Sequence, residues 1–153
     1  MASSHYLVFT LDEHAYALSL DAVARVLRAV YLTPVPEAPE ILLGVINMGG
    51  TVVPVMDIRN RLRLPSRPME AEDRIIVSKT ASRTMAFVAD GVEGIAVFGP
   101  DEMREPGQIL PDMEGRVEGI GITSDHTVLI YDINKLFSIP DMDGLKIDAD
   151  AQR

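Results

Sequence analysis

The sequence predicts a mainly β protein built as two small β-barrels that share apolar faces. Aliphatic residues dominate, since 47% of the 153 residues are hydrophobic, only 5% are aromatic and none is tryptophan. Such a composition favours strands rich in Val and Ile. Short apolar runs recur between turn residues along the chain. The order of these runs in the first half is repeated in the second half.

The N-terminal segment predicts a hairpin followed by a short helix. Residues Tyr6 to Leu11 and Tyr16 to Leu20 are expected to be strands around a polar turn. Asp21 is an acceptable N-cap, and behind it Val23 and Val26 have helical spacing. We therefore expect a short amphipathic helix after the hairpin.

The middle of the chain predicts a second hairpin with a tight glycine turn. Leu42 to Asn47 and Thr51 to Asp57 are expected to be strands. Gly49 and Gly50 supply the positive φ that such a turn needs. Pro54 has no N–H to donate to a neighbouring strand, so it argues for an edge position.

The second half predicts further strands and then a helical turn at "DINKLF". These strands are expected at Arg74 to Lys79, Thr84 to Ala89, Gly94 to Phe98, Val117 to Thr123 and Thr127 to Tyr131. The tail at 138–153 is acidic and has little to bury, so we expect it to be mobile.

An internal repeat organises these elements. At an offset of 69 residues Asp21 aligns with Asp90, and at an offset of 75 residues Asp57 aligns with Asp132. The alternative is a chance likeness between two Val-rich hairpins. Because a half of about 70 residues is too small to stabilise an open sheet, each half is expected to curl into a small barrel.

The composition excludes several classes of function. Asp and Glu number 23 against 14 Lys and Arg, and the formal net charge of −9 would repel a nucleic-acid backbone. The absence of cysteine excludes disulfides, thiol catalysis and cysteine-held metals. No stretch approaches the roughly 20 apolar residues of a membrane span, and the N-terminus lacks a signal-peptide pattern. We expect a cytoplasmic protein with no nucleic-acid partner and no membrane insertion.

Catalytic and metal-binding patterns are also missing. His5, His14 and His126 fall at the N-terminus and in turns, with no second ligand at helical spacing. Gly119 and Gly121 lack the third glycine of a dinucleotide fingerprint, so they are expected to ease strand packing. We expect no enzymatic activity, no metal and no cofactor.

A run of arginines follows the glycine hairpin, at Arg59, Arg61, Arg63 and Arg67. One interpretation is a solvated turn face, because charge runs are usually solvated. The other is electrostatic steering toward an acidic partner.

Several motifs in order resemble those of the CheW-like adaptors of bacterial chemotaxis. They are "YLVFTL", "GVINMGGTVVPVMDIRNRL", "DRIIV", "FVADGV" and "LIYDINKL". The resemblance implies two intertwined SH3-like five-stranded β-barrel subdomains sharing a core, with short helices. We expect one such domain at 6–137, with one subdomain at 16–69 and the other at 6–15 plus 70–137.

The resemblance also implies a function without catalysis. Such an adaptor couples the cytoplasmic tip of a chemoreceptor to the regulatory domain of a CheA-type histidine kinase. It works in the cytoplasm and is recruited to membrane-associated receptor arrays. The alternative is a small-molecule-binding or enzymatic β-barrel that uses the groove between the barrels. The lack of convergent His, Cys or paired acidic residues counts against this alternative.

The receptor-facing residues of the family fall on two segments of this chain. Carried over position by position, they are Val23, Arg25, Val26, Val45, Ile46, Asn47, Met48 and Gly49. For the valines and the isoleucine the alternative is simple burial in the core. The turn residues are the better interface candidates, because loops on a rigid scaffold commonly carry contacts.

Two of these positions depart from the family pattern. Where the family has V-x-E-I, this chain has Arg25 at the position of the glutamate. Where the family has N-L-R-G, this chain has Gly49 at the position of the arginine. In the family the two positions form an acid–base pair near the receptor groove. The resemblance therefore implies that the receptor contact of this chain differs from the usual one.

Overall fold

The structure is a computed structural model that describes residues 5–109, 117–123 and 126–137. Its strands are β1 (His5–Leu11), β2 (His14–Ser19), β3 (Val23–Arg28), β4 (Leu42–Met48), β5 (Thr51–Met56), β6 (Arg74–Lys79), β7 (Thr84–Ala89), β8 (Gly91–Val97), β9 (Met103–Arg104), β10 (Val117–Ile122) and β11 (Thr127–Tyr131). Its short helices are η1 (Leu20–Ala22), α1 (Ile58–Arg61), η2 (Pro100–Glu102), η3 (Pro106–Gln108) and α2 (Ile133–Leu136). The tail at 138–153 lies outside the described residues.

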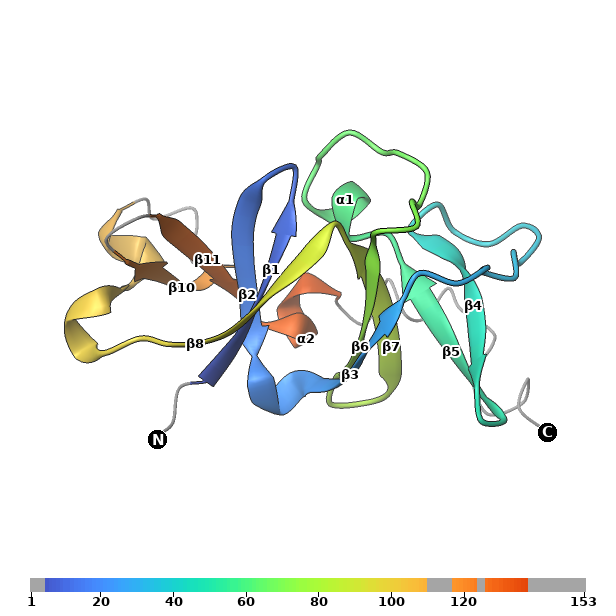
Figure 1. Cartoon of the computed structure of the whole chain (residues 1–153), viewed down its shortest axis with the longest axis horizontal. Coiled ribbons are helices and arrows are strands. Elements are labelled where there is room, and N and C mark those ends of the chain that lie inside the picture. The colour runs from blue at the N-terminus through green and yellow to red at the C-terminus, as the bar shows by residue number, and fades with distance from the viewer. Residues whose placement is uncertain (1–4, 110–116, 124–125, 138–153) are drawn as a thin grey trace.

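The strands form two sheets that lie side by side (Figure 1). One sheet has six strands in the order β8-β1-β2-β11-β10-β9, and the other has five in the order β3-β6-β7-β5-β4. When β1, β2, β8, β10 and β11 are replaced by their repeat partners β6, β7, β3, β4 and β5, the order β8-β1-β2-β11-β10 becomes that of the second sheet, and β9 is the extra strand. The mainly β fold class predicted from the sequence is confirmed.

The chain crosses between the sheets twice. It builds the β1–β2 hairpin in one sheet, passes through η1 into the other for β3 to β7, and returns after β7. The sheets therefore divide the chain differently from the expected subdomains at 16–69 and at 6–15 plus 70–137. The reason is that both strands of a tight hairpin stay in one sheet, so β2 remains with β1, and β6 and β7 remain together.

The segments that follow β3 and β8, each an end strand of its sheet, reach the other end of the same sheet and close it. After β3, the backbones of Thr33 and Val45 exchange two hydrogen bonds of 2.9 Å, which join this segment to β4. After β8, the short strand β9 pairs with β10. We call the two units the five-stranded barrel and the six-stranded barrel.

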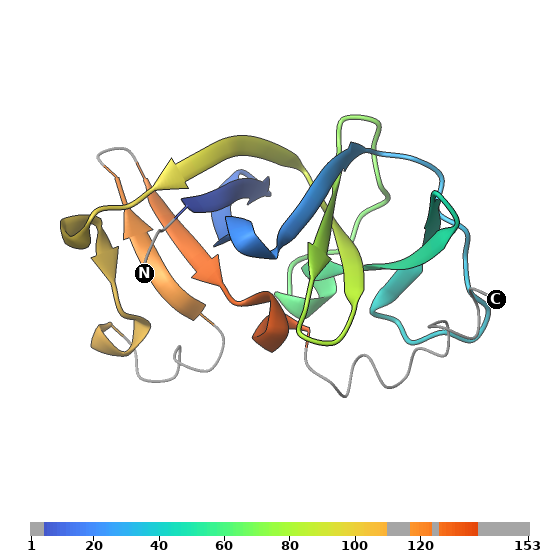
Figure 2. The same ribbon diagram turned by 90° about the horizontal axis from the view of Figure 1, so that it is seen from below.

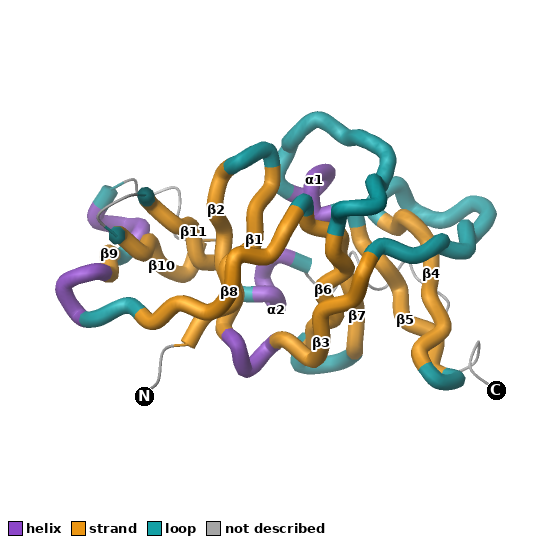
Figure 3. Tube along the Cα trace, viewed as in Figure 1, coloured by secondary structure: helices purple, strands orange, loops and turns teal. Residues whose placement is uncertain are grey.

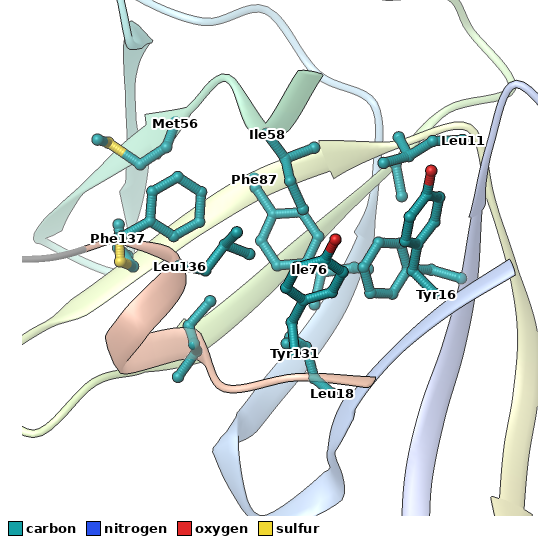
Figure 4. Close-up of a cluster of buried hydrophobic side chains, with 14 of the residues drawn as sticks. Leu11, Tyr16, Leu18, Met56, Ile58, Ile76, Phe87, Tyr131, Leu136 and Phe137 are labelled. Atoms are coloured by element: carbon teal, nitrogen blue, oxygen red, sulfur yellow. The ribbon is translucent and has the colours of Figure 1, made fainter. Parts of the chain in front are cut away.

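A shared core joins the barrels, as the resemblance implied. Phe9 of β1 and Phe87 of β7 belong to different barrels, and their ring centroids lie 5.2 Å apart. Leu136 and Phe137, in and directly after α2, belong to the same buried cluster (Figure 4). Each barrel also has a smaller core of its own. Rigid packing of this kind fixes one barrel against the other.

The prediction of a short helix behind Asp21 is wrong, because only one turn of 3-10 helix, η1, forms before strand β3. A β-bulge between Val23 and Arg25 places one extra residue in this strand. Val23 lies opposite Ser78 and Val26 opposite Ile76, so both valines share one face of the strand. Because of the bulge, two valines three residues apart lie on one face of a strand, and this spacing resembles that of a helix.

The prediction that Pro54 lies on an edge strand is also wrong, because its strand β5 lies between β4 and β7. The parallel pairing of β5 with β7 begins at Val55, one residue after the proline. Pro54 itself faces Val45 of β4. The proline is tolerated because it precedes the residues that need a donor on the β7 side.

Candidate functional site

Exposed aliphatic residues gather on β3 and β8, each of which is an end strand of its sheet. Val26 is 39% exposed, Ile95 59% and Val97 60%, and Val23 and Val92 beside them are half-buried. These five residues are called the edge-strand patch below. Isolated exposed aliphatics are ordinary, but a group on one face indicates an interaction surface.

The pairing registers show that the patch continues the shared core to the surface. On β8, Val92 lies opposite Phe9 and Ile95 opposite Leu7, and both partners on β1 belong to the shared core. On β3, Val26 lies opposite Ile76, which belongs to the same core. Residues directly opposite each other share a sheet face. Figures 1 and 2 show β3 and β8 on the same side of the molecule.

The two strands of the patch are repeat partners with the same irregularity. The bulge in β3 falls at Ala24, and the register shift between β1 and β8 falls at Glu93, 69 residues later. Ile95 and Val97 were missed as site residues from the sequence. The alignment of Val23 with Val92 and of Val26 with Ile95 was the signal that could have found them.

The structure separates the expected site residues into two groups. Val23, Arg25 and Val26 lie on β3, whereas positions 45–49 lie on the β4–β5 hairpin. β3 and β4 are the first and last strands of the sheet order, and the segment after β3 joins β4 through the pairing of Thr33 with Val45. Figure 1 shows the β4–β5 turn at the end of the five-stranded barrel away from β8.

The β4–β5 group is partly structural. Ile46 is only 7% exposed and belongs to the core of the five-stranded barrel, against which the half-buried Met48 packs. Gly49 and Gly50 have φ of 63° and 97°, as the turn prediction required. The side chain of the exposed Asn47 accepts a 2.7 Å hydrogen bond from the N–H of Gly50. Asn47 and Gly49 remain candidates for contact.

The arginine run is not simply a solvated face. Arg59 is 7% exposed, and its Nη2 lies 2.8 Å from Asp12 Oδ1 and 2.9 Å from Asp90 Oδ2. Arg67 pairs with Asp90 at 2.6 Å and with Asp73 at 2.9 Å. We call these five residues the ion network.

The ion network joins parts of both barrels. Asp12 lies in the β1–β2 turn, Arg59 in α1 and Asp90 at the crossover from β7 to β8. Arg67 and Asp73 lie in the loop between α1 and β6, which arches over α1 (Figure 3). The N–H of Asp12 also donates a 2.7 Å hydrogen bond to Asp90. Half-buried Arg61 donates from Nε to the carbonyl of Leu136, which links α1 to α2.

A pocket of about 160 Å³ lies beside the ion network. Its apolar wall includes Leu32, Leu43 and Val88, and its polar end is formed by members of the network. Both arginines at this end are already paired with carboxylates. The pocket therefore gives little support to a small-molecule or enzymatic function, which needs convergent polar groups available to a ligand.

Acid should weaken the ion network through Asp90. Burial raises the pKa of this carboxyl, but the N–H of Asp12 and the guanidinium of Arg59 together lower it below its ordinary value of 3.8. A carboxyl with a depressed folded pKa contributes stability that is fully present above its ordinary value and lost as pH falls through the folded value. We expect the urea midpoint to fall between about pH 5 and pH 2, and to fall less in Asp90→Asn. Equal falls in the two proteins would assign the acid sensitivity to other groups.

Other chemistry is not evident in the described part of the chain. There, no group of three or more His, Cys, Asp or Glu side chains is placed to hold a metal ion. No helix of residues 5–109, 117–123 and 126–137 is long and apolar enough to cross a membrane.

Comparisons with known proteins agree with this geometry. The CheW-like domain family matches residues 5–141. The chemotaxis protein CheW of Klebsiella aerogenes is 23% identical over 138 residues, which cover 90% of this chain and 83% of the relative. CheW of Bacillus subtilis is 28% identical over 129 residues, covering 84% and 83%. The crystal structure of the scaffolding protein TtCheW from Thermoanaerobacter tengcongensis superimposes with a TM-score of 0.80 and 27% identity, covering 92% of this chain and 96% of that one.

The paired barrels share their fold with a scaffolding protein, to which the chain is 27% identical. The chain belongs to the CheW-like domain family. Proteins of this family are non-enzymatic adaptors of chemotaxis, which couple chemoreceptors to the kinase CheA.

Proposed function

We propose that this protein couples the cytoplasmic tip of a chemoreceptor to the regulatory domain of a CheA-type histidine kinase. The receptor tip binds the edge-strand patch, and the kinase domain binds elsewhere on the barrels. The protein works in the cytoplasm and is recruited to receptor arrays. The observation that carries this proposal is the exposed patch on β3 and β8, which continues the shared core.

The patch suits a partner that brings apolar side chains of its own. Val26, Ile95 and Val97 leave aliphatic surface in water that an amphipathic segment would cover. In the described part of the chain, no further strand pairs with the outer edge of β3 or β8. The ion network holds the barrels together close to the start of β8, so the two halves of the patch form one rigid surface.

A charge placed on the patch should abolish receptor binding without unfolding the protein. We expect Val26→Asp and Ile95→Asp each to weaken binding of a purified receptor cytoplasmic fragment by about tenfold or more, because each replaces an aliphatic contact by a carboxylate that must lose its water on binding. Binding of the purified kinase regulatory domain should be retained. Surface plasmon resonance measures both interactions, and thermal melts verify folding.

Ile109→Asp is the matched control, since Ile109 is 54% exposed and lies outside the patch. This variant should bind the receptor fragment as the wild type does. Unchanged receptor binding in both patch variants would show that the patch is not the receptor site.

A further inference from the structure

We propose that the segment bound by the edge-strand patch carries acidic residues beside its apolar ones, and that Arg25 and Arg28 of β3 bind those carboxylates. This inference rests on the proposed function, because it specifies the partner of the same patch.

Arg25 and Arg28 are exposed arginines without a carboxylate partner among the described residues. Within the part of the chain that the structure describes, neither forms an ion pair, whereas Arg59 and Arg67 are fully paired. The whole chain carries 23 acidic against 14 basic residues. Two cations without partners on one short strand are therefore a local reversal of the protein's overall charge.

The neighbouring strand adds to the positive charge. Arg28 lies directly opposite Arg74 of β6. The Nη1 of Arg74 donates to the backbone carbonyls of Glu72 and Asp73, at 2.8 and 3.0 Å, and no described carboxylate pairs with it. Like charges directly opposite each other on a sheet are destabilising. A bound carboxylate would relieve this repulsion.

The positive charges lie next to the apolar residue that the partner would cover. Arg25, Val26 and Arg28 belong to the same strand, and strand alternation places Val26 and Arg28 on one face. A segment packed on Val26 would therefore have its polar rim within reach of Arg28. Arg25 projects from the other face of the same strand, at the open edge of the sheet.

The other half of the patch lacks this charge, which gives the partner an orientation. The positions in β8 that repeat Arg25 and Arg28 are Gly94 and Val97, and the bulge residue of β8 is the exposed Glu93. The acidic residues of the partner should lie over β3, and its uncharged or basic residues over β8. Complementary charge of this kind fixes orientation and raises the association rate.

The test uses the full-length protein and three synthetic helical peptides with the same apolar stripe. The residues that flank the stripe are Glu in the first peptide, Gln in the second and Lys in the third. We expect the Glu peptide to bind about five- to tenfold more tightly than the Gln peptide at low salt, and the Lys peptide to bind least. The preference should fade at high salt. Isothermal titration calorimetry measures affinity, and amide chemical shifts of β3 and β8 locate the bound peptide.

The double variant Arg25→Gln with Arg28→Gln should lose the preference for Glu and keep the affinity for the Gln peptide. The control is Arg63→Gln with Arg104→Gln, which removes the same charge at two exposed arginines outside the patch. This control should keep the preference. Equal affinity of the wild type for the Glu and Gln peptides, a preference that survives in the Arg25 and Arg28 variant, or no binding of any peptide would overturn the inference.

Failure of this inference is distinguishable from failure of the proposed function. If the Gln peptide binds as well as the Glu peptide and Ile95→Asp abolishes both, the patch is a docking surface without a preference for acid. If Val26→Asp and Ile95→Asp leave binding of the receptor fragment unchanged, the receptor site proposed above is wrong.

Discussion

Arg59→Met is expected to lower the free energy of unfolding by about 3 kcal/mol and the melting temperature by about 6–12 °C. Arg59 is 7% exposed and joins Asp12 to Asp90 across the barrel junction. Methionine fills much of the same space but leaves Asp12 without its cation. Removing one partner of a buried ion pair costs about 3–5 kcal/mol. We expect the lower end, because Asp90 keeps Arg67 and the Asp12 side chain is 40% exposed.

Arg63→Met is the matched control for this measurement. Arg63 lies two residues after α1, is exposed and forms no ion pair with a described carboxylate. Its replacement should change the free energy of unfolding by less than about 0.5 kcal/mol. Urea unfolding of the three proteins at neutral pH gives both values. A loss of similar size in the two variants would show that the ion network contributes no specific stability.

Gly121→Ala is expected to destabilise the protein by about 1–3 kcal/mol, well beyond Gly119→Ala. Both glycines lie on β10 and share one face of the strand. A Cβ at Gly121 would lie 2.5 Å from the ring of Phe98, which is itself buried in the core of the six-stranded barrel. A rigid aromatic ring packed against a strand cannot move slightly to make room for a methyl group.

Gly119→Ala serves as the control on the same strand. There the nearest atom to a new Cβ is the terminal methyl of Met103, at 3.0 Å. A flexible thioether side chain moves at little cost, so we expect less than about 1 kcal/mol. Thermal melts compare the variants, and Phe98→Leu combined with Gly121→Ala should cost less than the sum of the two single changes. Equal effects of the two alanine variants would contradict the packing explanation.

The ion network connects stability to the proposed interface. Asp90 directly precedes β8, which carries Ile95 and Val97 of the edge-strand patch. The network also holds α1 and the β1–β2 turn at this crossover. A loosened junction would let β8 shift relative to β3. Variants of Arg59 should therefore be compared with patch variants only at temperatures where both are folded.

Strand β3 shows where local pattern and tertiary structure disagree. Val23 and Val26 have helical spacing, and nothing in this stretch alone distinguishes a helix from a bulged strand. Pairing with β6 decides the matter, because the bulge at Ala24 places both valines on the face of the shared core. The equivalent bulge in β8 shows that this irregularity belongs to the repeat.

The ion network could not be predicted from the sequence. Its members are spread from Asp12 to Asp90, and the arginines alone resemble an ordinary solvated charge run. Only the crossing of the chain between barrels brings the β1–β2 turn, α1 and the β7–β8 crossover together. Among the described residues, Arg63 of the run forms no ion pair, and neither do Arg25 and Arg28 on β3.

The sequence by itself determined the mainly β class, the hairpins with their glycine turn, the repeat and the likeness to the CheW-like family. The β class and the hairpins follow from short-range rules, since period-two alternation, turn residues and helix caps act over a few neighbouring residues. The repeat and the likeness follow from comparing one stretch of sequence with another, which needs no structure. Tertiary structure alone decided which sheet each strand joins, which strands lie outermost and which charges are paired. Those outcomes depend on contacts between distant segments, whose free energy comes from packing and burial in the whole fold rather than from any local pattern.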